Sequence, residues 1–584
     1  MRPSTRKWIL LAAAAAVFYA ASTQVRPLDD LRTGENLALP ALPEKAQPSM
    51  LLTPLLAVGR APLVDYLWMR ATTLKDEGRF FDAYQLSQMI CELQPKFASV
   101  WAFQAWNMSY NISVTLRTPE ERWRWVRNGY ELLRDKGIPL NPTSTQLYRE
   151  LAWILFHKVG DYMDEWHYYY KLQFALQMED ILGEPPDDYV RPGRVRGDYY
   201  RDYDFKSLAE APATFEELSK KPGVAPFVER LKEFGFDAGK EGIFLGLLSA
   251  LKKSDVRLPN VRPGEEANRL HDLEAFMSDP ATREAQVAIE HFWRAQRLKN
   301  EVKLDPQRIL DLQKTYDLTF DFRLPDSHAL YWAYIGLEKG IDTREYIDVH
   351  RLNTNRLEFF CLQKIFHRGR MAMSPNARLG EPPLFSPDLR VVPVLFDAYL
   401  RDSEKYLNRE KENKVVSTNF ETGFVGFVRS AILRYYEAGM EKEAREKFDY
   451  LKEHFPDPMY DKGLSGFIAK QFLLDRELGD HRVAMSRIGL LVRDAMLMYA
   501  YDEDDQAVRR MNRAKQVYDT YQQGTSSDRM KIPRTFAQIV EEVVQGADWG
   551  RGPRDTYEKV CRKLGIEPLP QAPTSAPAEG ALAP

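Results

Sequence analysis

The chain has 584 residues, of which 44% are hydrophobic and 12% aromatic, so it is not a disordered protein and is long enough for several domains. Its 81 Lys and Arg residues are balanced by 84 Asp and Glu residues. Binding to duplex nucleic acid needs a basic surface, so this near balance argues against a nucleic-acid partner. The cysteines, Cys91, Cys361 and Cys561, lie far apart and show none of the spacings of a metal or haem site, so we expect no cofactor.

An apolar segment near the N-terminus predicts a membrane anchor. Basic residues precede an uncharged run from Trp8 to Val25, which is typical of an export signal with its basic end in the cytoplasm. As a helix the run spans about 27 Å at ~1.5 Å per residue, close to the thickness of a hydrocarbon core. We predict one transmembrane segment at residues 1–25, with the main body on the exoplasmic (periplasmic) side. The alternatives are a cleaved signal peptide and a buried N-terminal core helix.

The rest of the chain divides into segments by its apolar periodicity, prolines and glycines. Alternating apolar and polar residues do not recur as they would in strands, so we predict an all-α fold. The expected segments are a Pro-rich tether at 26–60, helical repeats at 61–180, an irregular helical insert at 181–325, further helical repeats at 326–521, a small helical end at 522–566 and a disordered tail at 567–584.

One spacing of glycine, alanine and proline occurs twice, far apart in the chain. It is formed by Gly78, Ala83 and Pro95, and again by Gly439, Ala444 and Pro456. Each copy lies within a pair of predicted helices of about 34 residues, which is the period of a helical repeat. A single helix pair cannot bury its own apolar face and needs neighbouring pairs stacked on it. The spacing therefore favours a stacked binding surface over a catalytic pocket.

These residues resemble tetratricopeptide repeats, whose helix–turn–helix units carry small residues where the helices cross and a proline at the end. The chain departs from that pattern at Ile90, which replaces a small residue of the second helix. The resemblance implies an α-solenoid with a concave groove for other proteins or peptides. The matching residues are Leu67, Ala71, Gly78, Ala83, Pro95, Trp101, Ala105, Leu151, Ala152, Tyr435, Gly439, Ala444, Phe448 and Pro456.

Aromatic residues are crowded in the first repeat region, with tryptophans from residue 68 to residue 166 and three consecutive tyrosines soon after. Such side chains fill the gaps between helices, and they also line grooves for extended or helical peptides. We select as candidate groove residues Trp106, Trp123, Trp153, Trp166 and Tyr169.

The strongest candidates for site chemistry lie between His157 and His167. If Asp164 and His167 share a helix face they could bind a metal, and Asp164 or Glu165 could be the general acid of an enzyme that cleaves envelope polymers. Helix capping, with His157 at a helix end and Asp161 at a helix start, explains these residues better than site chemistry. No phosphate loop, nucleophile elbow or paired-histidine motif occurs, so we assign no catalytic, cofactor or metal residue.

The sequence thus predicts a membrane-anchored scaffold that binds other proteins or peptides on the exoplasmic side. The alternatives are the envelope-polymer hydrolase, with its acidic residue near 161–167, and a spacer that holds a partner at a fixed distance from the membrane. An enzyme needs a deep cleft with carboxylates of raised pKa, whereas a spacer needs no groove.

Overall fold

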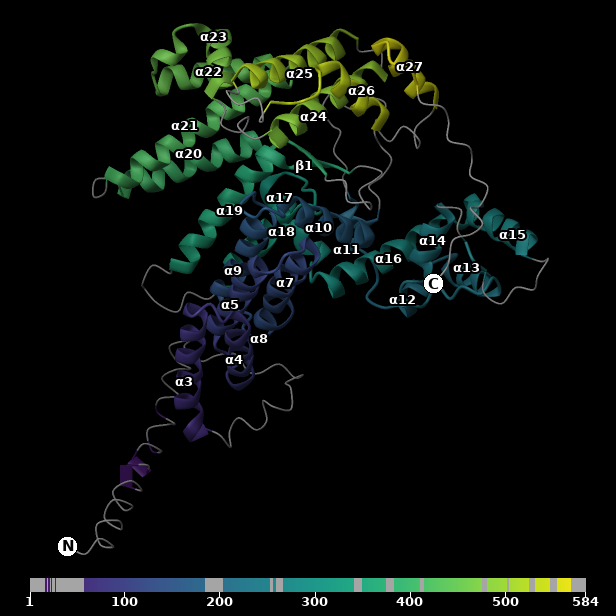
Figure 1. Ribbon diagram of the computed structural model, residues 1–584. Helices are drawn as coiled ribbons and strands as arrows, with labels where there is room; N and C mark the ends of the chain where they lie inside the picture. Colours follow the sequence, from purple (N-terminus) through teal and green to yellow (C-terminus); the bar gives the residue numbers. More distant parts are fainter. Residues whose placement is uncertain are drawn as a thin grey trace, which may run out of the picture. The chain divides into compact units, whose positions relative to one another are not determined.

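A computed structural model describes most of the chain from residue 57 onward. The described ranges are 57–183, 203–252, 256–258, 266–340, 349–373, 383–409, 414–474, 481–500, 504–524, 531–546 and 554–568, with a few residues between 16 and 27. The described chain is mostly helical with almost no strand, which confirms the all-α prediction for this part (Figure 1). No helix among these residues is long and apolar enough to cross a bilayer. The predicted anchor, tether and tail lie almost entirely outside the described residues.

The chain forms two compact units. Unit 1 comprises residues 1–158 and 332–358, and unit 2 comprises residues 159–331 and 359–584. Helices α18 (Pro325–Lys339) and α19 (Val349–Arg368) contribute residues to both units.

The C-terminal half of α18 belongs to unit 1, where it packs against helix α9 (Thr145–Trp153). The ring centroids of Tyr148 and Trp332 lie 6.2 Å apart. A Cβ atom added at Gly336 would lie 2.5 Å from Cβ of Tyr148, so only glycine allows this approach of the two helices. Close packing across such a long sequence separation leaves no local signal in the sequence.

Unit 1 is built from short helices that pack as consecutive pairs. Helix α3 packs on α4, α5 packs on α7 and α9, and α7 packs on η1. The elements before α9 are α3 (Ala57–Asp76), α4 (Phe80–Leu93), α5 (Ala98–Trp106), η1 (Asn107–Ile112), α6 (Ser113–Thr115), α7 (Pro119–Leu132), η2 (Leu133–Gly137) and α8 (Ile138–Leu140). The element after α9 is η3 (Ile154–Val159).

Three segments of this series, η1, η2 and η3, are π-helical turns that continue an α-helix. A π-helical turn has the wider i→i+5 hydrogen-bond spacing, is rare, and often occurs at functional sites. Among the described residues, all π-helical segments begin in unit 1. They therefore mark the N-terminal helices as the part of the chain with unusual local geometry.

Unit 2 contains the remaining helices and one short antiparallel hairpin, in which Met371 pairs with Phe385. Its elements are α10 (His167–Leu182), α11 (Phe205–Ala209), α12 (Phe215–Ser219), α13 (Val224–Glu233), α14 (Ile243–Lys252), α15 (Glu266–Ser278), η4 (Pro280–Thr282), α16 (Arg283–Glu301), α17 (Pro306–Tyr316), β1 (Arg370–Ala372), β2 (Leu384–Ser386), α20 (Val391–Arg409), α21 (Lys414–Glu437), α22 (Glu441–His454), η6 (Pro458–Tyr460), α23 (Gly463–Leu474), α24 (His481–Ala500), α25 (Asp504–Gly524), α26 (Phe536–Gly546) and α27 (Arg554–Leu564).

Two features organise the first half of unit 2. Helices α12 to α16 enclose a small apolar core, where the indole N–H of Trp293 donates to the carbonyl of Ala238 at 2.8 Å. Arg323 is only 1% exposed and donates to Glu179 of α10 at 2.9 Å and to the carbonyl of Met371 of β1 at 3.0 Å. Asp321 pairs with the same guanidinium at 2.6 Å, so Arg323 links the hairpin to the helices while its charge stays compensated.

The two copies of the glycine, alanine and proline spacing fold into the same local structure, one in each unit. Gly78 follows α3 with φ +76°, and Gly439 follows α21 with φ +73°. A Cβ atom at either glycine would meet open space, so glycine is required there for its left-handed backbone alone. The turn is closed by backbone bonds from Arg79 to Leu74 and from Met440 to Tyr435, at 2.8 and 2.9 Å.

The alanine of each copy lies on the second helix of its pair. Ala83 and Ala444 have no exposed surface, which fits a position where two helices cross closely. The prolines differ, since Pro95 is buried and Pro456 is exposed. The carbonyl of Pro95 accepts from the indole of Trp101 at 2.9 Å, which joins the first pair to the next helix.

The other residues of the proposed repeat pattern are buried as well. They have 7% exposure or less: Leu67, Ala71, Trp101, Ala105, Leu151, Ala152, Tyr435 and Phe448.

Candidate functional site

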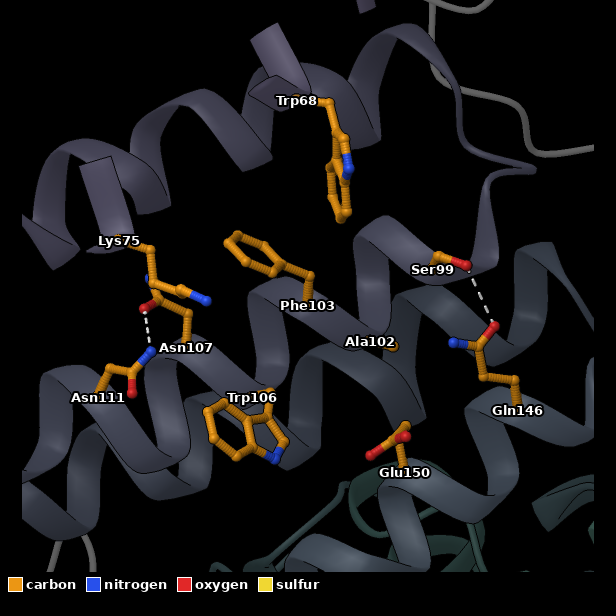
Figure 2. Close-up of a pocket in the computed structure, with 10 residues that line it drawn as sticks. All are labelled: Trp68, Lys75, Ser99, Ala102, Phe103, Trp106, Asn107, Asn111, Gln146 and Glu150. Atoms are coloured by element: carbon orange, nitrogen blue, oxygen red, sulfur yellow. Dashed lines mark hydrogen bonds between the residues drawn. The ribbon is translucent and has the colours of Figure 1, made fainter. Parts of the chain in front are cut away.

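A pocket of about 290 Å³ lies between helices of unit 1 (Figure 2). Its wall is formed by α3, α5, η1 and α9, of which α3 and α5 are the first helices of successive pairs. The lining residues are Trp68, Lys75, Ser99, Ala102, Phe103, Trp106, Asn107, Asn111, Gln146 and Glu150.

The spacing of these residues explains how each helix presents them to the pocket. Residues three, four or seven positions apart lie on one face of an α-helix, because a turn has about 3.6 residues. On α3, Trp68 and Lys75 are separated by two turns, and the same holds on α5 for Ser99 and Trp106. The pocket is therefore made from one face of each helix.

Aromatic rings form the apolar part of the pocket wall. The ring centroids of Trp68 and Phe103 are 5.0 Å apart in an edge-to-face arrangement, and both side chains are half-buried. The side chain of Trp106 is 43% exposed, which is unusual for so large an apolar group. These three rings offer a surface on which an apolar side chain of a ligand can pack.

The amide groups of the wall are held by hydrogen bonds within the protein (Figure 2). Asn111 donates to Oδ1 of Asn107 at 2.9 Å, and Asn107 donates to the carbonyl of Phe80 at 3.1 Å. On the other side of the pocket, the hydroxyl of Ser99 donates to Oε1 of Gln146 at 3.3 Å. These bonds fix the orientations of the polar side chains before any ligand binds.

Two groups of opposite charge complete the pocket. Lys75 lies 3.2 Å from the carboxylate of Asp76, and both side chains are at least a third exposed. The side chain of Glu150 is only 14% exposed, and its Oε1 atom contacts the guanidinium of Arg149. Burial raises the pKa of Glu150 above its ordinary value, although the charge of Arg149 partly opposes this. The carboxylate is thus partly stripped of water, and a cation placed beside it stabilises its charged form.

A row of aromatic side chains continues from the pocket along η1 and η3. Trp106 stacks on Tyr110 with a centroid distance of 4.8 Å, and His157 stacks on Trp153 at 5.0 Å. The hydroxyl of Tyr110 lies 3.2 Å from Nδ1 of His157 and joins the two stacks. Burial raises the pKa of Tyr110, so its hydroxyl stays protonated. The row extends the aromatic surface beyond the pocket.

The candidate groove residues chosen from the sequence are distributed over both units. Trp106 lines the pocket, and Trp153 belongs to the aromatic row. Trp123 is 8% exposed on α7, where it packs against Tyr130 in the interior of a pair. Trp166 and Tyr169 lie in unit 2, at the start of α10 and within it.

Sequence analysis did not select most of the residues that line the pocket. The largest omissions are Trp68, Phe103, Lys75 and Glu150. A signal for two of them exists, because Trp68 directly follows Leu67 and Phe103 lies between Trp101 and Ala105. Both residues are aromatic and lie on the first helix of a pair, on a different face from the buried repeat residues. That combination is the sequence signal that would have identified them.

The acidic candidates at 161–167 lie in a turn that precedes α10 and contains an ion pair. The expectation that Asp161 begins a helix is wrong, because α10 begins at His167. Asp161 instead accepts from the backbone N–H of Tyr162 at 2.9 Å and from Nζ of Lys364 at 3.1 Å. Asp164 also precedes the helix and accepts from the N–H of Trp166 at 2.9 Å, so it does not share a helix face with His167.

The electrostatics of this turn do not suit a general acid. Burial favours a higher pKa for Asp161, but the charges of Lys364 and Arg368 outweigh it and lower the pKa below its ordinary value. A general acid at neutral pH needs a raised pKa. Glu165 is exposed to solvent. The turn is therefore better explained as a structural ion network.

A buried lysine belongs to the same network. Lys171 is 4% exposed, donates to the carbonyl of Asp161 at 2.9 Å and lies 2.8 Å from Nδ1 of His167. Burial, followed by the charge of Arg368, lowers the pKa of Lys171 well below its ordinary value. Arg368 in turn donates two hydrogen bonds to Asp326, at 2.9 and 2.7 Å. The network, which we call the α10 ion cluster, consists of Asp161, His167, Lys171, Asp326, Lys364 and Arg368.

Within the part of the chain that the structure describes, no three His, Cys, Asp or Glu side chains are placed to hold a metal ion.

Comparisons with protein-family models, with curated proteins and with solved structures each found no match. The function must therefore be argued from the pocket itself.

Proposed function

We propose that this chain is a membrane-anchored scaffold that binds a segment of another protein in the pocket of unit 1. The single observation that supports this is an open pocket with one exposed and two half-buried aromatic rings and with fixed amide groups on adjoining helices. Aromatic side chains contribute most of the energy in protein interfaces, and hydrogen-bonding groups around them provide specificity. A segment that enters this pocket obtains binding energy from the aromatic rings and specificity from the amide groups.

The helix pairs are proposed to belong to a tetratricopeptide-like solenoid. This rests on the repeated spacing and on the matching turns at Gly78 and Gly439. In such a stack the first helices of successive pairs line one face, which agrees with a pocket lined by α3 and α5. The membrane anchor and the exoplasmic location are proposed from the N-terminal sequence alone.

Site-specific photo-cross-linking tests the proposed binding function. The photoreactive analogue p-benzoyl-phenylalanine replaces Trp106 in the full chain, which is expressed in its own membranes. The matched control carries the same analogue at Met89 of α4, which is 49% exposed and does not line the pocket. We expect a discrete cross-linked protein from position 106 and none from position 89.

A second variant tests whether cross-linking at position 106 depends on the aromatic wall of the pocket. Phe103→Ala combined with the analogue at 106 removes part of the aromatic wall, so the cross-linked product should decrease at least about tenfold, which corresponds to ~1.4 kcal/mol of binding energy. Equal products from positions 106 and 89, or a product that Phe103→Ala does not change, contradict the proposal.

A further inference from the structure

The charged groups of the pocket lie on different helices and on different sides of its aromatic centre. Lys75 comes from α3 and Glu150 from α9. Figure 2 shows their side chains on opposite sides of Phe103 and Trp106. A segment that crosses the aromatic centre therefore meets a positive group at one end of the pocket and a negative group at the other.

The Glu150 end is suited to a basic side chain. The carboxylate is largely buried, and its contact with Arg149 uses one oxygen atom, Oε1. An ionised carboxylate has about four acceptor positions on its two oxygens, so a second cation can bind at Oε2. Because burial raises the pKa of Glu150, a ligand cation there offsets the cost of keeping the carboxylate charged. Trp106 lines the same pocket, and its indole ring attracts the cation of a basic ligand side chain through a cation–π interaction.

The Lys75 end is suited to an acidic side chain. The ion pair between Lys75 and Asp76 joins neighbouring residues whose side chains are 35% and 66% exposed. Exposed pairs of this kind contribute about 0–1 kcal/mol, so the ammonium can exchange Asp76 for a ligand carboxylate at little cost.

The size of the pocket limits what can lie between the two ends. A volume of about 290 Å³ lies at the lower limit of the ~300–1,000 Å³ typical of ligand sites. The aromatic centre formed by Trp68, Phe103 and Trp106 therefore accommodates one or two apolar side chains instead of a whole helix.

We propose that the pocket selects its partner by the order of charges along the bound segment. An apolar or aromatic side chain packs on the three rings, an acidic side chain faces Lys75, and a basic side chain faces Glu150. The ligand is a peptide segment of a partner protein, so this inference rests on the proposed binding function. The fixed amides of Asn111 and Gln146 hydrogen-bond the backbone of the segment and set its direction, so a segment of reversed charge order places like charges together at both ends.

Two pools of synthetic peptides test this inference. Each peptide has nine residues, is acetylated and amidated, and carries a central Leu or Phe. In one pool an acidic residue precedes the centre by two positions and a basic residue follows it by two positions, and the second pool has the reverse order. Both pools have the same composition, so any difference between them comes from order alone. Binding to the full chain in detergent micelles is measured by fluorescence anisotropy.

We expect the wild-type protein to bind one pool at least about tenfold more tightly than the other, a difference of ~1.4 kcal/mol. The double variant Lys75→Glu and Glu150→Lys should prefer the opposite pool, because it exchanges the two charges. The control exchanges an exposed pair on α22, Lys442→Glu with Glu446→Lys, and should keep the wild-type preference.

The possible outcomes separate this inference from the proposed function. Equal binding of both pools, lost in Trp106→Ala, overturns charge-ordered recognition and leaves the binding function in place. If the double variant Lys75→Glu and Glu150→Lys keeps the wild-type preference, charge-ordered recognition is likewise overturned and the binding function is left in place. If neither pool binds while the cross-link at position 106 forms, charge order is again overturned. If both the peptides and the cross-link fail, the proposed function is overturned as well.

Discussion

The pocket of unit 1 and the α10 ion cluster of unit 2 contain similar residue types in opposite environments. Both hold a lysine and an acidic residue, and both lie beside aromatic side chains. In the pocket, Lys75 and Glu150 border an open volume. In the cluster, Lys171 and Asp161 are 4% and 8% exposed and are surrounded by charged partners. Residue types therefore indicate a binding site only where the packing leaves room for a ligand.

The largest expected effect comes from breaking the ion cluster at Arg368→Met. This change leaves the carboxylate of Asp326, which is 2% exposed, without the guanidinium that donates both its hydrogen bonds. Removing one partner of a buried ion pair costs about 3–5 kcal/mol of the free energy of unfolding. Urea unfolding of the full chain, followed by circular dichroism, measures the loss.

The control for Arg368→Met is Lys442→Met, whose side chain is 85% exposed and whose partner Glu446 lies 3.9 Å away. It should change the free energy of unfolding by less than about 0.5 kcal/mol. A similarly small effect of Arg368→Met means that the cluster is not a structural network, and the contrast with the pocket then disappears.

A smaller effect, which depends on acid, is expected for Asp161→Asn. The pKa of Asp161 is lowered in the folded protein, so its ion pairs stabilise the fold above pH about 4 and are lost as the pH falls through the folded pKa. The variant should lose about 1.5–3 kcal/mol at pH 7, the range for hydrogen bonds to charged groups. Thermal midpoints of both proteins measured between pH 7 and pH 2.5 should approach each other at the acid end.

The control for Asp161→Asn is again Lys442→Met, which should lose less than about 0.5 kcal/mol at pH 7. A difference between Asp161→Asn and the wild type that stays constant down to pH 2.5 contradicts the role given to Asp161.

The same cluster should respond to alkaline pH through Lys171. Its pKa is lowered in the folded state, so the unfolded chain binds more protons and the free energy of unfolding rises with pH up to about 10.4, the ordinary pKa of lysine. Lys171→Met removes this titration. The difference in thermal midpoint between variant and wild type should therefore change steadily from pH 7 to pH 10.5, and a constant difference shows that Lys171 keeps its ordinary pKa.

The smallest effect on stability is expected in the pocket. Trp106 is 43% exposed, so Trp106→Ala should change the free energy of unfolding by less than about 1 kcal/mol. The same change should abolish peptide binding, because it removes one of the three rings of the pocket centre. A loss of more than ~2 kcal/mol on unfolding, as for a core aromatic residue, shows that Trp106 serves packing and that the pocket is no binding site.

Local features of the fold were predictable from the sequence. The turn at Gly78 needs a residue that adopts a left-handed backbone conformation, and the position of Ala83 needs a small side chain. Both requirements come from residues nearby in the sequence. The same holds for Gly439 and Ala444, which is why one spacing predicted two similar turns in different units. The absence of alternating patterns likewise predicted the all-α fold.

The location of the candidate site was not predictable to the same degree. Trp106 was selected, but Trp123 has the same residue type and is buried within its pair. The sequence does not distinguish them, since burial depends on which helix packs on which. Asp161 was misplaced for a similar reason, because its partner Lys364 is 203 residues away.

The sequence by itself determined the all-α class and the two glycine turns with their buried alanines, because hydrogen bonds and side-chain size act over one or two turns. The tertiary structure alone decided which polar and aromatic residues border open space and which are enclosed. That choice depends on how helices distant in the chain pack, so Glu150 lies at a pocket while Asp161 lies within an ion network.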